Sequence, residues 1–240
     1  FAWTPVENVS NQPSGSRAFG PKIAVDLLGQ VHLVWPGGQD EAWRVWYQRF
    51  DGAAWSAPVS LSGPGANRPD IAIDGHGTVH VAYEEAAERN IWYRRKPAGG
   101  AWSSPVNLQT GGRSISPNIA VNSAGDRIAV AWHEDGQVGG EWDIFVNVFN
   151  GSSWSGTFNA SANSVLSAEA RVCIDPQGSL HVGWTDRSAN GGTQYVRYRR
   201  RDTGGTWSAV ATIHSTPRRC SLNSLHAAAD GRIHVGFTDD

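Results

Sequence analysis

Four arginines stand at similar places in the chain and could bind a carboxylate or sugar hydroxyls. Arg17, Arg113 and Arg219 each lie four residues before the start of an apolar run, and Arg68 lies directly before another. A guanidinium group offers N–H donors in a fixed fork, which suits a carboxylate or a pair of hydroxyl groups. Arginines and acids on a solvated rim also neutralise one another, so a purely structural role stays open for these residues.

Acidic and aromatic residues form a second set, which follows apolar runs that end in Trp or Tyr. Glycoside hydrolysis needs two carboxylates about 5–9 Å apart, but nearness in sequence does not give that distance. The acids between residues 134 and 143 are the best place for such a pair, and we assign no catalytic residue. No Asp-x-Asp-x-Asp-Gly calcium loop occurs, so we expect neither a metal nor a cofactor. The candidate ligand-binding residues of this set are Trp43, Glu84, His133, Glu134, Asp135 and Trp142.

Two recurring sequence phrases indicate which elements position these residues. A phrase of the Trp-Ser-x-Pro-Val type begins at Trp55 and Trp102, with looser copies at residues 3, 154 and 207. A second phrase, an Ile-Ala-Val-Asp run followed by a turn and a Val-His run, places its turn glycines at 29, 77, 125, 178 and 231. Two independent landmarks that share one period of about 50 residues indicate a repeat protein.

Each repeat is predicted to form four short antiparallel strands, because alternating apolar residues are separated by glycine turns and no segment has a helical period. Four strands in about 50 residues is the period of a β-propeller blade. We therefore predict an all-β fold, a five-bladed β-propeller of four-stranded antiparallel blades, as one domain over residues 1–240. The last blade is incomplete in this chain, since only its first two strands are present.

The sequence does not decide which segment completes the last blade. The segment Trp3–Ser10 has the pattern of an outer strand and could close the ring against the C-terminal repeat. The strand that should lie between them is absent, so we expect it to come from further chain beyond Asp240 or from a partner chain.

Strand direction alternates within a blade, and this places the candidate residues together. The connections between the fourth and first strands and between the second and third strands emerge at the same end of every blade. The arginines precede the innermost strands, so we expect them around the mouth of the central channel.

One segment resembles the Asp-box of the sialidase-type propeller family. Asp202-Thr-Gly204-Gly-Thr206-Trp207 matches the pattern Ser-x-Asp-x-Gly-x-Thr-Trp, except that Arg200 replaces the serine. The resemblance implies a propeller architecture and says little about chemistry. Sialidases of this family have six blades and use three arginines, a Tyr–Glu pair and an Asp. No Tyr–Glu pair falls on a matching motif here, and five blades are similar to tachylectin-type lectins in number alone.

Several residue types recur at one position of the repeat and are expected to be structural. His32, His80, His181 and His234 occupy one place in the second strand, and a catalytic residue would not recur in this way. The repeated tryptophans are expected to pack between blades for the same reason. Cys173 and Cys220 lie in or just before neighbouring inner strands, where we predict a disulfide.

Composition narrows the function classes. The 20 Lys and Arg against 22 Asp and Glu give a net charge of −2, which argues against a nucleic-acid binder. No apolar run approaches the ~20 residues that span a bilayer, so membrane insertion is not expected. The chain opens on Phe1 without a signal-like segment, which favours a processed, secreted and extracellular protein.

We therefore predict a secreted, non-catalytic, lectin-like propeller whose partners are glycans or glycoconjugates. The alternatives are a sialidase-like glycoside-cleaving enzyme and a protein-interaction propeller. Equivalent loop residues in several blades favour binding, whereas acids confined to one blade favour catalysis. The third repeat comes closest to the second case.

Overall fold

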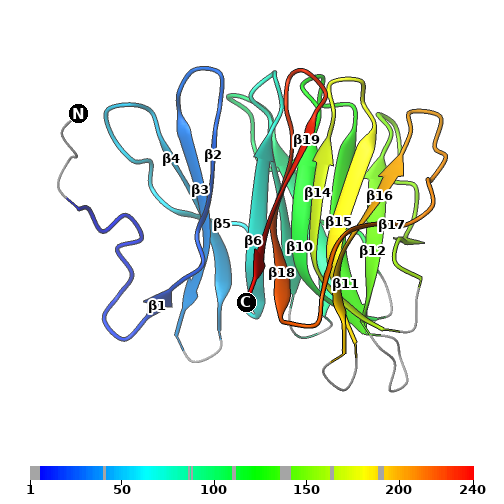
Figure 1. The fold of residues 1–240 in the computed structure, drawn as a ribbon. Helices are drawn as coiled ribbons and strands as arrows, with labels where there is room; N and C mark the ends of the chain where they lie inside the picture. The colour runs from blue at the N-terminus through cyan, green and yellow to red at the C-terminus, as the bar shows by residue number, and fades with distance from the viewer. Residues whose placement is uncertain are drawn as a thin grey trace.

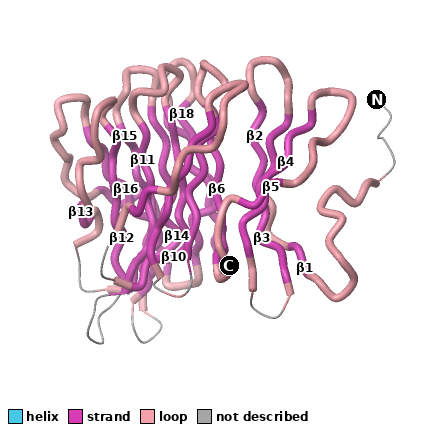
Figure 2. The backbone as a smooth tube through the Cα atoms, turned by 180° about the vertical axis from the view of Figure 1, so that it is seen from behind, coloured by secondary structure: helices cyan, strands magenta, loops and turns pink. Residues whose placement is uncertain are grey.

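The computed structural model describes residues 6–39, 42–85, 87, 89–109, 112–135, 142–162, 165–188 and 192–240. In this part of the chain the regular secondary structure consists of strands and includes no helix (Figure 2). The strands form antiparallel sheets in chain order, and Figure 1 shows them following one another from the blue first sheet to the red last hairpin. The predicted all-β class and the four-stranded antiparallel units are confirmed.

We label the sheets A to E in chain order. In sheets A and B the second strand pairs with both the inner strand and the third strand, and a very short outer strand follows. Sheet A has its inner strand in two pieces. The strands of these two sheets are β1 (Arg17–Ala18), β2 (Lys22–Val25), β3 (Val31–Gly38), β4 (Arg44–Phe50), β5 (Val59–Ser60), β6 (Ala66–Ile73), β7 (Val79–Glu85), β8 (Asn90–Lys96) and β9 (Val106–Asn107).

Sheets C and D repeat this plan, and sheet E is a two-stranded hairpin. Inner strands of successive sheets touch, so that β6 contacts β10, β10 contacts β14 and β14 contacts the first strand of sheet E. The remaining strands are β10 (Arg113–Val121), β11 (Ile128–Asp135), β12 (Trp142–Phe149), β13 (Phe158–Asn159), β14 (Leu166–Ile174), β15 (Leu180–Arg187), β16 (Gln194–Arg201), β17 (Ala211–Thr216), β18 (Cys220–Ala227) and β19 (Ile233–Asp239).

A tight turn joins the first two strands of each sheet, and in sheets A, B and D an aspartate fixes the turn geometry. In sheet B, Asp74 Oδ1 accepts the backbone N–H groups of His76 at 2.9 Å and Thr78 at 2.8 Å. Gly77 takes a φ of +76°, a left-handed conformation that glycine adopts without steric cost. The Asp-x-x-Gly pattern therefore forms the predicted hairpin turns.

Aromatic side chains fill the space between neighbouring sheets. Trp132 and Trp184, at one place on the second strands of sheets C and D, are fully buried. Trp102 of sheet B meets Tyr47 of sheet A edge to face, with ring centroids 5.0 Å apart. Trp154 of sheet C meets Tyr93 of sheet B at the same distance. Trp102, Trp154 and Trp207 therefore pack between sheets, as predicted, whereas Trp55 contacts Phe50 of its own sheet and Trp3 lies outside the described residues. Each aromatic pair adds about 1 kcal/mol beyond its buried area.

The inner strands share a bulge that changes their register. The non-glycine residues Arg68, Ser116 and Glu169 occupy equivalent bulge positions and have φ values of +45°, +55° and +60°. Beyond each bulge the next side chain links two sheets. Asp70 Oδ2 accepts the N–H of Ile119 at 2.9 Å, for example, so β6 is tied to β10.

The N-terminal segment differs from the prediction. Residues 6–10 form no strand, and Trp3 lies outside the described residues. The expected outer strand over Trp3–Ser10 is therefore wrong for the part that the structure describes. Val6 is fully exposed, so this segment makes no strand ladder and buries no apolar side chain there.

The predicted disulfide is also wrong, because Cys173 and Cys220 are buried free thiols. Cys220 pairs with Asp239 at the start of its inner strand, as Ser167 pairs with Asp186 in sheet D. Cys173 lies six residues beyond Ser167 on that sheet, which corresponds to roughly 15–20 Å along a strand with a bulge. A disulfide requires Cα atoms within about 7 Å, so the two thiols stand at opposite ends of neighbouring strands.

Candidate functional site

The sheets have two chemically different ends. The turn end carries the hairpin turns between the inner and second strands and lies at the top of Figure 1. The loop end carries the starts of the inner strands and the connections from second to third strands, at the bottom of that figure. The predicted ligand-binding residues all belong to the loop end. No helix in the described ranges is long and apolar enough to cross a membrane.

The four predicted arginines lie in different surroundings at the loop end. Arg17 and Arg113 are the first residues of β1 and β10, Arg219 directly precedes β18, and all three are exposed. Arg68 lies in the bulge of β6 and donates from Nη1 to Glu84 Oε2 at 3.1 Å. About half of the Arg68 side chain is exposed (48%), whereas Glu84 is buried. Arg68 and Glu84 are thus brought together.

Glu134 is a structural carboxylate, in contrast to its predicted role in ligand binding. It is buried, and its Oε2 accepts the hydroxyl of Ser114 at 2.7 Å and the indole N–H of Trp132 at 3.1 Å. Asp186 stands at the same place in sheet D and accepts the indole N–H of Trp184 at 2.7 Å. An arrangement that recurs from sheet to sheet orients the buried tryptophans, so Glu134 is not free to act on a ligand.

The position one residue earlier is different in each sheet. Glu84 holds this place in sheet B, His133 in sheet C and Thr185 in sheet D. Thr185 Oγ1 donates to Glu169 and accepts the backbone N–H of Leu222, both at 2.9 Å. Glu84 is engaged by Arg68, as described above. The fold does not require one residue type at this position. The residue type therefore differs from sheet to sheet at the loop end.

His133 has the most unusual surroundings of these three residues. Its ring packs on Trp142, with ring centroids 4.9 Å apart, and its Nδ1 is buried without a hydrogen-bond partner among the described residues. Burial is the largest cause that lowers the pKa of His133, to about 4, followed by the positive charges of Arg68, Arg187 and Arg171. The imidazole is therefore neutral at pH 7, in a positive electrostatic field.

Sequence reasoning missed Arg171, Arg187 and Glu169 because they lie within or at the ends of strands and not in loops. Arg187 forms an ion pair with Glu169. Arg171 donates from Nε to the carbonyl oxygen of Asn223 and from Nη1 to that of Ala170, both at 2.9 Å. The sequence did contain one signal that points to Arg171. A polar residue interrupts each otherwise apolar inner strand at positions 22, 70, 118 and 171.

The other predicted residues are placed as follows. Trp43 meets Phe19 edge to face, with centroids 5.0 Å apart, at the loop end of sheet A. The backbone of Asp135 pairs with Arg113, while its side chain and Glu141 lie outside the described residues. Asp143, the last acid of the stretch from residue 134 to 143, accepts hydrogen bonds from the side chains of Asn159 and Ser161. The two described acids of this stretch, Glu134 and Asp143, are therefore both engaged in hydrogen bonds and do not form a free carboxylate pair for hydrolysis.

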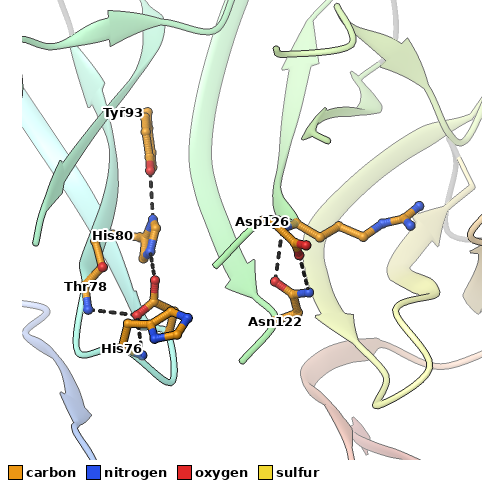
Figure 3. Close-up of polar contacts among 8 residues, drawn as sticks. His76, Thr78, His80, Tyr93, Asn122 and Asp126 are labelled. Atoms are coloured by element: carbon orange, nitrogen blue, oxygen red, sulfur yellow. Dashed lines mark hydrogen bonds and ion pairs between the residues drawn. The ribbon is translucent and has the colours of Figure 1, made fainter. Parts of the chain in front are cut away.

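The turn end carries a repeated triad. His80 Nδ1 lies 2.7 Å from the hydroxyl of Tyr93, and His80 Nε2 lies 3.3 Å from Asp74 Oδ2 (Figure 3). Burial lowers the pKa of His80 and so favours the neutral ring, which accepts from the tyrosine and donates to the carboxylate. Burial alone would raise the pKa of Asp74, but the N–H of Thr78 and the His80 ring outweigh it and lower that pKa.

Sheets A and D build the same triad from His32, Asp26 and Tyr47 and from His181, Asp175 and Tyr198. The predicted structural role of these histidines is confirmed. In sheet C the histidine is absent, and Asn122 bonds Asp126 at 2.7 Å instead (Figure 3). His234 in the two-stranded sheet E is exposed, in contrast to the prediction, because no third strand supplies a tyrosine there.

Across the ranges that the structure describes, no three His, Cys, Asp or Glu side chains gather closely enough to hold a metal ion.

Comparison with known proteins gives a fold and no family. No family model matches the sequence, and no curated protein matches it. The Asp-box resemblance therefore rests on residues 202–207 and the repeat pattern alone.

Solved structures match over almost the whole chain. A protein of unknown function from Dyadobacter fermentans has a TM-score of 0.65 at 14% identity, over 92% of this chain and 75% of its own. A PL25 ulvan lyase bound to -[GlcA(1-4)Rha3S]- has a TM-score of 0.64 at 16% identity, over 92% of this chain and 63% of its own. An α-L-arabinanase from Penicillium chrysogenum complexed with arabinobiose has a TM-score of 0.61 at 12% identity, over 92% of this chain and 75% of its own.

The chain has a β-propeller fold. It spans less than two thirds of the length of the lyase that it matches. At these identities the likeness concerns the arrangement of the strands and does not extend to a reaction. The lyase and the arabinanase are themselves each bound to a carbohydrate.

Proposed function

We propose that this protein is a lectin-like propeller that binds an acidic sugar at its loop end, between sheets C and D. The observation that carries the proposal is the surroundings of the partly buried His133 ring, which packs on Trp142 and lies in the positive field of the Arg68, Arg187 and Arg171 guanidinium groups. A carboxylate or sulfate group on a sugar is the partner that such a field attracts. Arg171 is the central residue, because its hydrogen bonds to the carbonyl oxygens of Asn223 and Ala170 do not compensate its charge.

An aromatic wall completes the proposed site. Trp142 packs on His133 and is partly exposed, so its open face is available for the apolar side of a sugar ring. Arg17, Arg113 and Arg219 are candidate contacts for further sugar units at the same end, and the charge of Arg68 also acts on His133. The lyase among the structural neighbours is bound to a glycan that contains GlcA and Rha3S, which supports an acidic ligand class.

The proposal includes five blades, of which sheet E is the incomplete fifth. Exposed apolar side chains on the two outermost sheets support the addition of further strands, since Ile23 in β2 is 66% exposed and Phe237 in β19 is 37% exposed. The added strands come from further chain or from a partner. Intact mass of the native protein, together with its mass in solution, separates these sources.

Secretion is part of the same proposal and is tested by locating the native protein in culture fractions.

The test is an isothermal titration with two probes, an oligosaccharide of glucuronate and 3-sulfated rhamnose and neutral arabinobiose. We expect the acidic probe to bind the wild type and Arg171→Ala to weaken it about tenfold or more, because a charge-assisted contact is lost. Arg95→Ala is the matched control, since Arg95 is an exposed arginine on β8 near the turn end. Equal binding of both probes, or equal loss in both variants, would contradict the proposal.

Cleavage of an acidic glycan by elimination is a second candidate, favoured by the unpartnered Nδ1 of the neutral His133. Such a nitrogen can accept the proton on the carbon next to a uronate carboxylate, while a nearby guanidinium neutralises that carboxylate. The bond from the neighbouring carbon to the glycosidic oxygen then breaks, a carbon–carbon double bond forms, and water protonates the leaving oxygen. Hydrolysis is less well supported, because Glu134 and Asp143 are committed to hydrogen bonds.

Ultraviolet absorbance of the unsaturated uronate distinguishes the two candidates. Turnover by the wild type that is lost in His133→Gln, while binding is kept, would establish elimination. Binding without turnover would leave the lectin-like function.

A further inference from the structure

A cavity of about 430 Å³ opens between sheets A and B at the turn end, away from the site proposed above. Its wall in sheet A comes from the turn residues Leu27 and Leu28 and from Arg49 of β4. Its wall in sheet B comes from Val79 at the start of β7 and Lys96 at the end of β8. The volume lies in the range of small-molecule sites, which is about 300–1,000 Å³.

The cavity exists because the turns of sheets A and B do not join. At the next junction Gly75 N donates to Ser123 O at 2.8 Å, which ties the turn of sheet B to that of sheet C. Leu27 occupies the place of Gly75 in sheet A, and within the described residues no backbone bond joins it to sheet B. Leu27 and Leu28 are instead 83% and 82% exposed. This turn therefore presents two apolar side chains to solvent beside an open cavity.

Two cations line the cavity without a matching number of acids. Neither Arg49 nor Lys96 forms an ion pair with a carboxylate among the described residues. Asp26 also lines the cavity, but its carboxylate already forms hydrogen bonds with the His32 ring and with the N–H groups of Leu28 and Gln30. The cavity thus has a surplus of positive charge.

In sheet D the arginine equivalent to Arg49 has a hydrogen-bond partner within the protein. Arg200 faces His181 in register, as Arg49 faces His32, and it donates to Ser179 Oγ at 2.7 Å. Gln30 stands at the place of Ser179 in sheet A, and its Oε1 is buried without a partner. The polar groups in the cavity therefore lack the internal bonds that their counterparts make.

We propose that this cavity binds a small organic oxyanion, a carboxylate, sulfate or phosphate group joined to a compact apolar part. Arg49 and Lys96 hold the anionic group by charge-assisted hydrogen bonds, and the Gln30 side chain donates to it from its amide Nε2. The apolar part lies against Leu27, Leu28 and Val79. This site does not depend on the glycan site, since it lies at the opposite end of the sheets and uses other residues.

The test is a methyl NMR titration of the wild type with phenyl phosphate, benzoate and inorganic phosphate as probes. We expect the methyl signals of Leu27, Leu28 and Val79 to shift and saturate with phenyl phosphate or benzoate. Inorganic phosphate alone should bind more weakly, because it lacks the apolar part. Stronger binding of phenyl phosphate than of benzoate identifies a phosphate-type anion, and the reverse identifies a carboxylate.

Variants make the assignment specific. Arg49→Gln and Lys96→Gln should each weaken binding about tenfold, whereas Arg95→Gln, at the place of Arg49 in sheet B, should leave it unchanged. Both cations are partly or fully exposed, and thermal unfolding checks that each variant folds. Absence of methyl shifts with every probe would overturn the proposal, as would equal weakening in Arg95→Gln. Neither result bears on glycan binding by Arg171.

Discussion

The turn end and the loop end use the same strands in opposite ways. At the turn end, three sheets place a histidine between a tyrosine and an aspartate with nearly the same geometry. At the loop end, the residue that follows each buried aromatic side chain changes from Glu84 to His133 to Thr185. Repetition marks what every sheet needs in order to fold, and departure from it marks where one junction has acquired its own chemistry.

Adjacent residues on β11 make the same distinction at closer range. Asp186 has the same function in sheet D that Glu134 has in sheet C, because each carboxylate orients a buried tryptophan. His133, its neighbour in sequence, has no counterpart in the other sheets and keeps an unpartnered ring nitrogen. The two side chains point to opposite faces of the sheet, because strand residues alternate. A strand can thus carry folding and binding residues side by side.

The largest effect on folding is expected from the turn end. Asp74→Ala removes the acceptor for the N–H groups of His76 and Thr78 and for the buried ring of His80. We expect the free energy of unfolding to fall by about 3 kcal/mol, because buried donors lose their partner. Denaturant unfolding measures this. Asp51→Ala is the control, since Asp51 also accepts two turn N–H groups but is fully exposed, and it should cost clearly less.

Glu134 and His133 should separate stability from binding. Glu134→Ala leaves the indole N–H of Trp132 and the hydroxyl of Ser114 without an acceptor, and we expect a loss of about 2 kcal/mol. His133→Gln should change the free energy of unfolding by less than about 1 kcal/mol and weaken acidic-glycan binding. The two quantities are measured by denaturant unfolding and titration calorimetry. A His133 variant that unfolds easily and binds normally would reverse the assignment.

Acidification should weaken the folded state through the buried histidines His32 and His80. Their pKa values are lowered on folding, chiefly by burial, so their contribution is complete above the unfolded value of about 6.5 and is lost as pH falls through the folded values. Each histidine that is neutral when folded and protonated when unfolded contributes a slope of about 1.4 kcal/mol per pH unit. His80→Gln should flatten the curve of unfolding free energy between pH 7 and pH 5, and an unchanged slope would contradict this account.

A smaller effect is expected for the hydroxyl in the triad. Tyr93→Phe keeps the ring that packs on Trp154 and removes only the partner of His80 Nδ1. We expect about 1 kcal/mol of lost stability, as is usual for one hydrogen bond, and no change in ligand binding. A loss as large as that of Asp74→Ala would show that the hydroxyl, and not the carboxylate, fixes the ring.

The repeat made the fold predictable from sequence. The turn glycines and the Val-His runs gave the strands, their order and the structural role of three histidines, because each repeat is one unit that buries its faces against the next. The repeat did not predict the free state of Cys173 and Cys220, since that depends on where along neighbouring strands each thiol lies. It also suggested a strand over residues 3–10, although residues 6–10 do not form one.

The candidate site was predicted only in its location. Loop residues were the natural choice from sequence, and the structure does place them at one end of the sheets. Arg171 and Arg187 escaped notice because they lie in strands, and their relation to His133 depends on how β14, which pairs with β15, packs against β11. Glu134 looked like a loop acid because its acceptor role for Trp132 and Ser114 is visible only in three dimensions.

The most direct test of the loop-end assignment is an NMR titration of side-chain signals with the glucuronate and 3-sulfated rhamnose oligosaccharide. We predict that the His133 ring and the Trp142 indole shift together and saturate, while the His80 and Tyr93 rings at the turn end stay unchanged. Arg171→Ala should abolish the shifts at the same ligand concentration. Shifts confined to the turn end, or none at His133 and Trp142 while the ligand binds, would contradict the assignment.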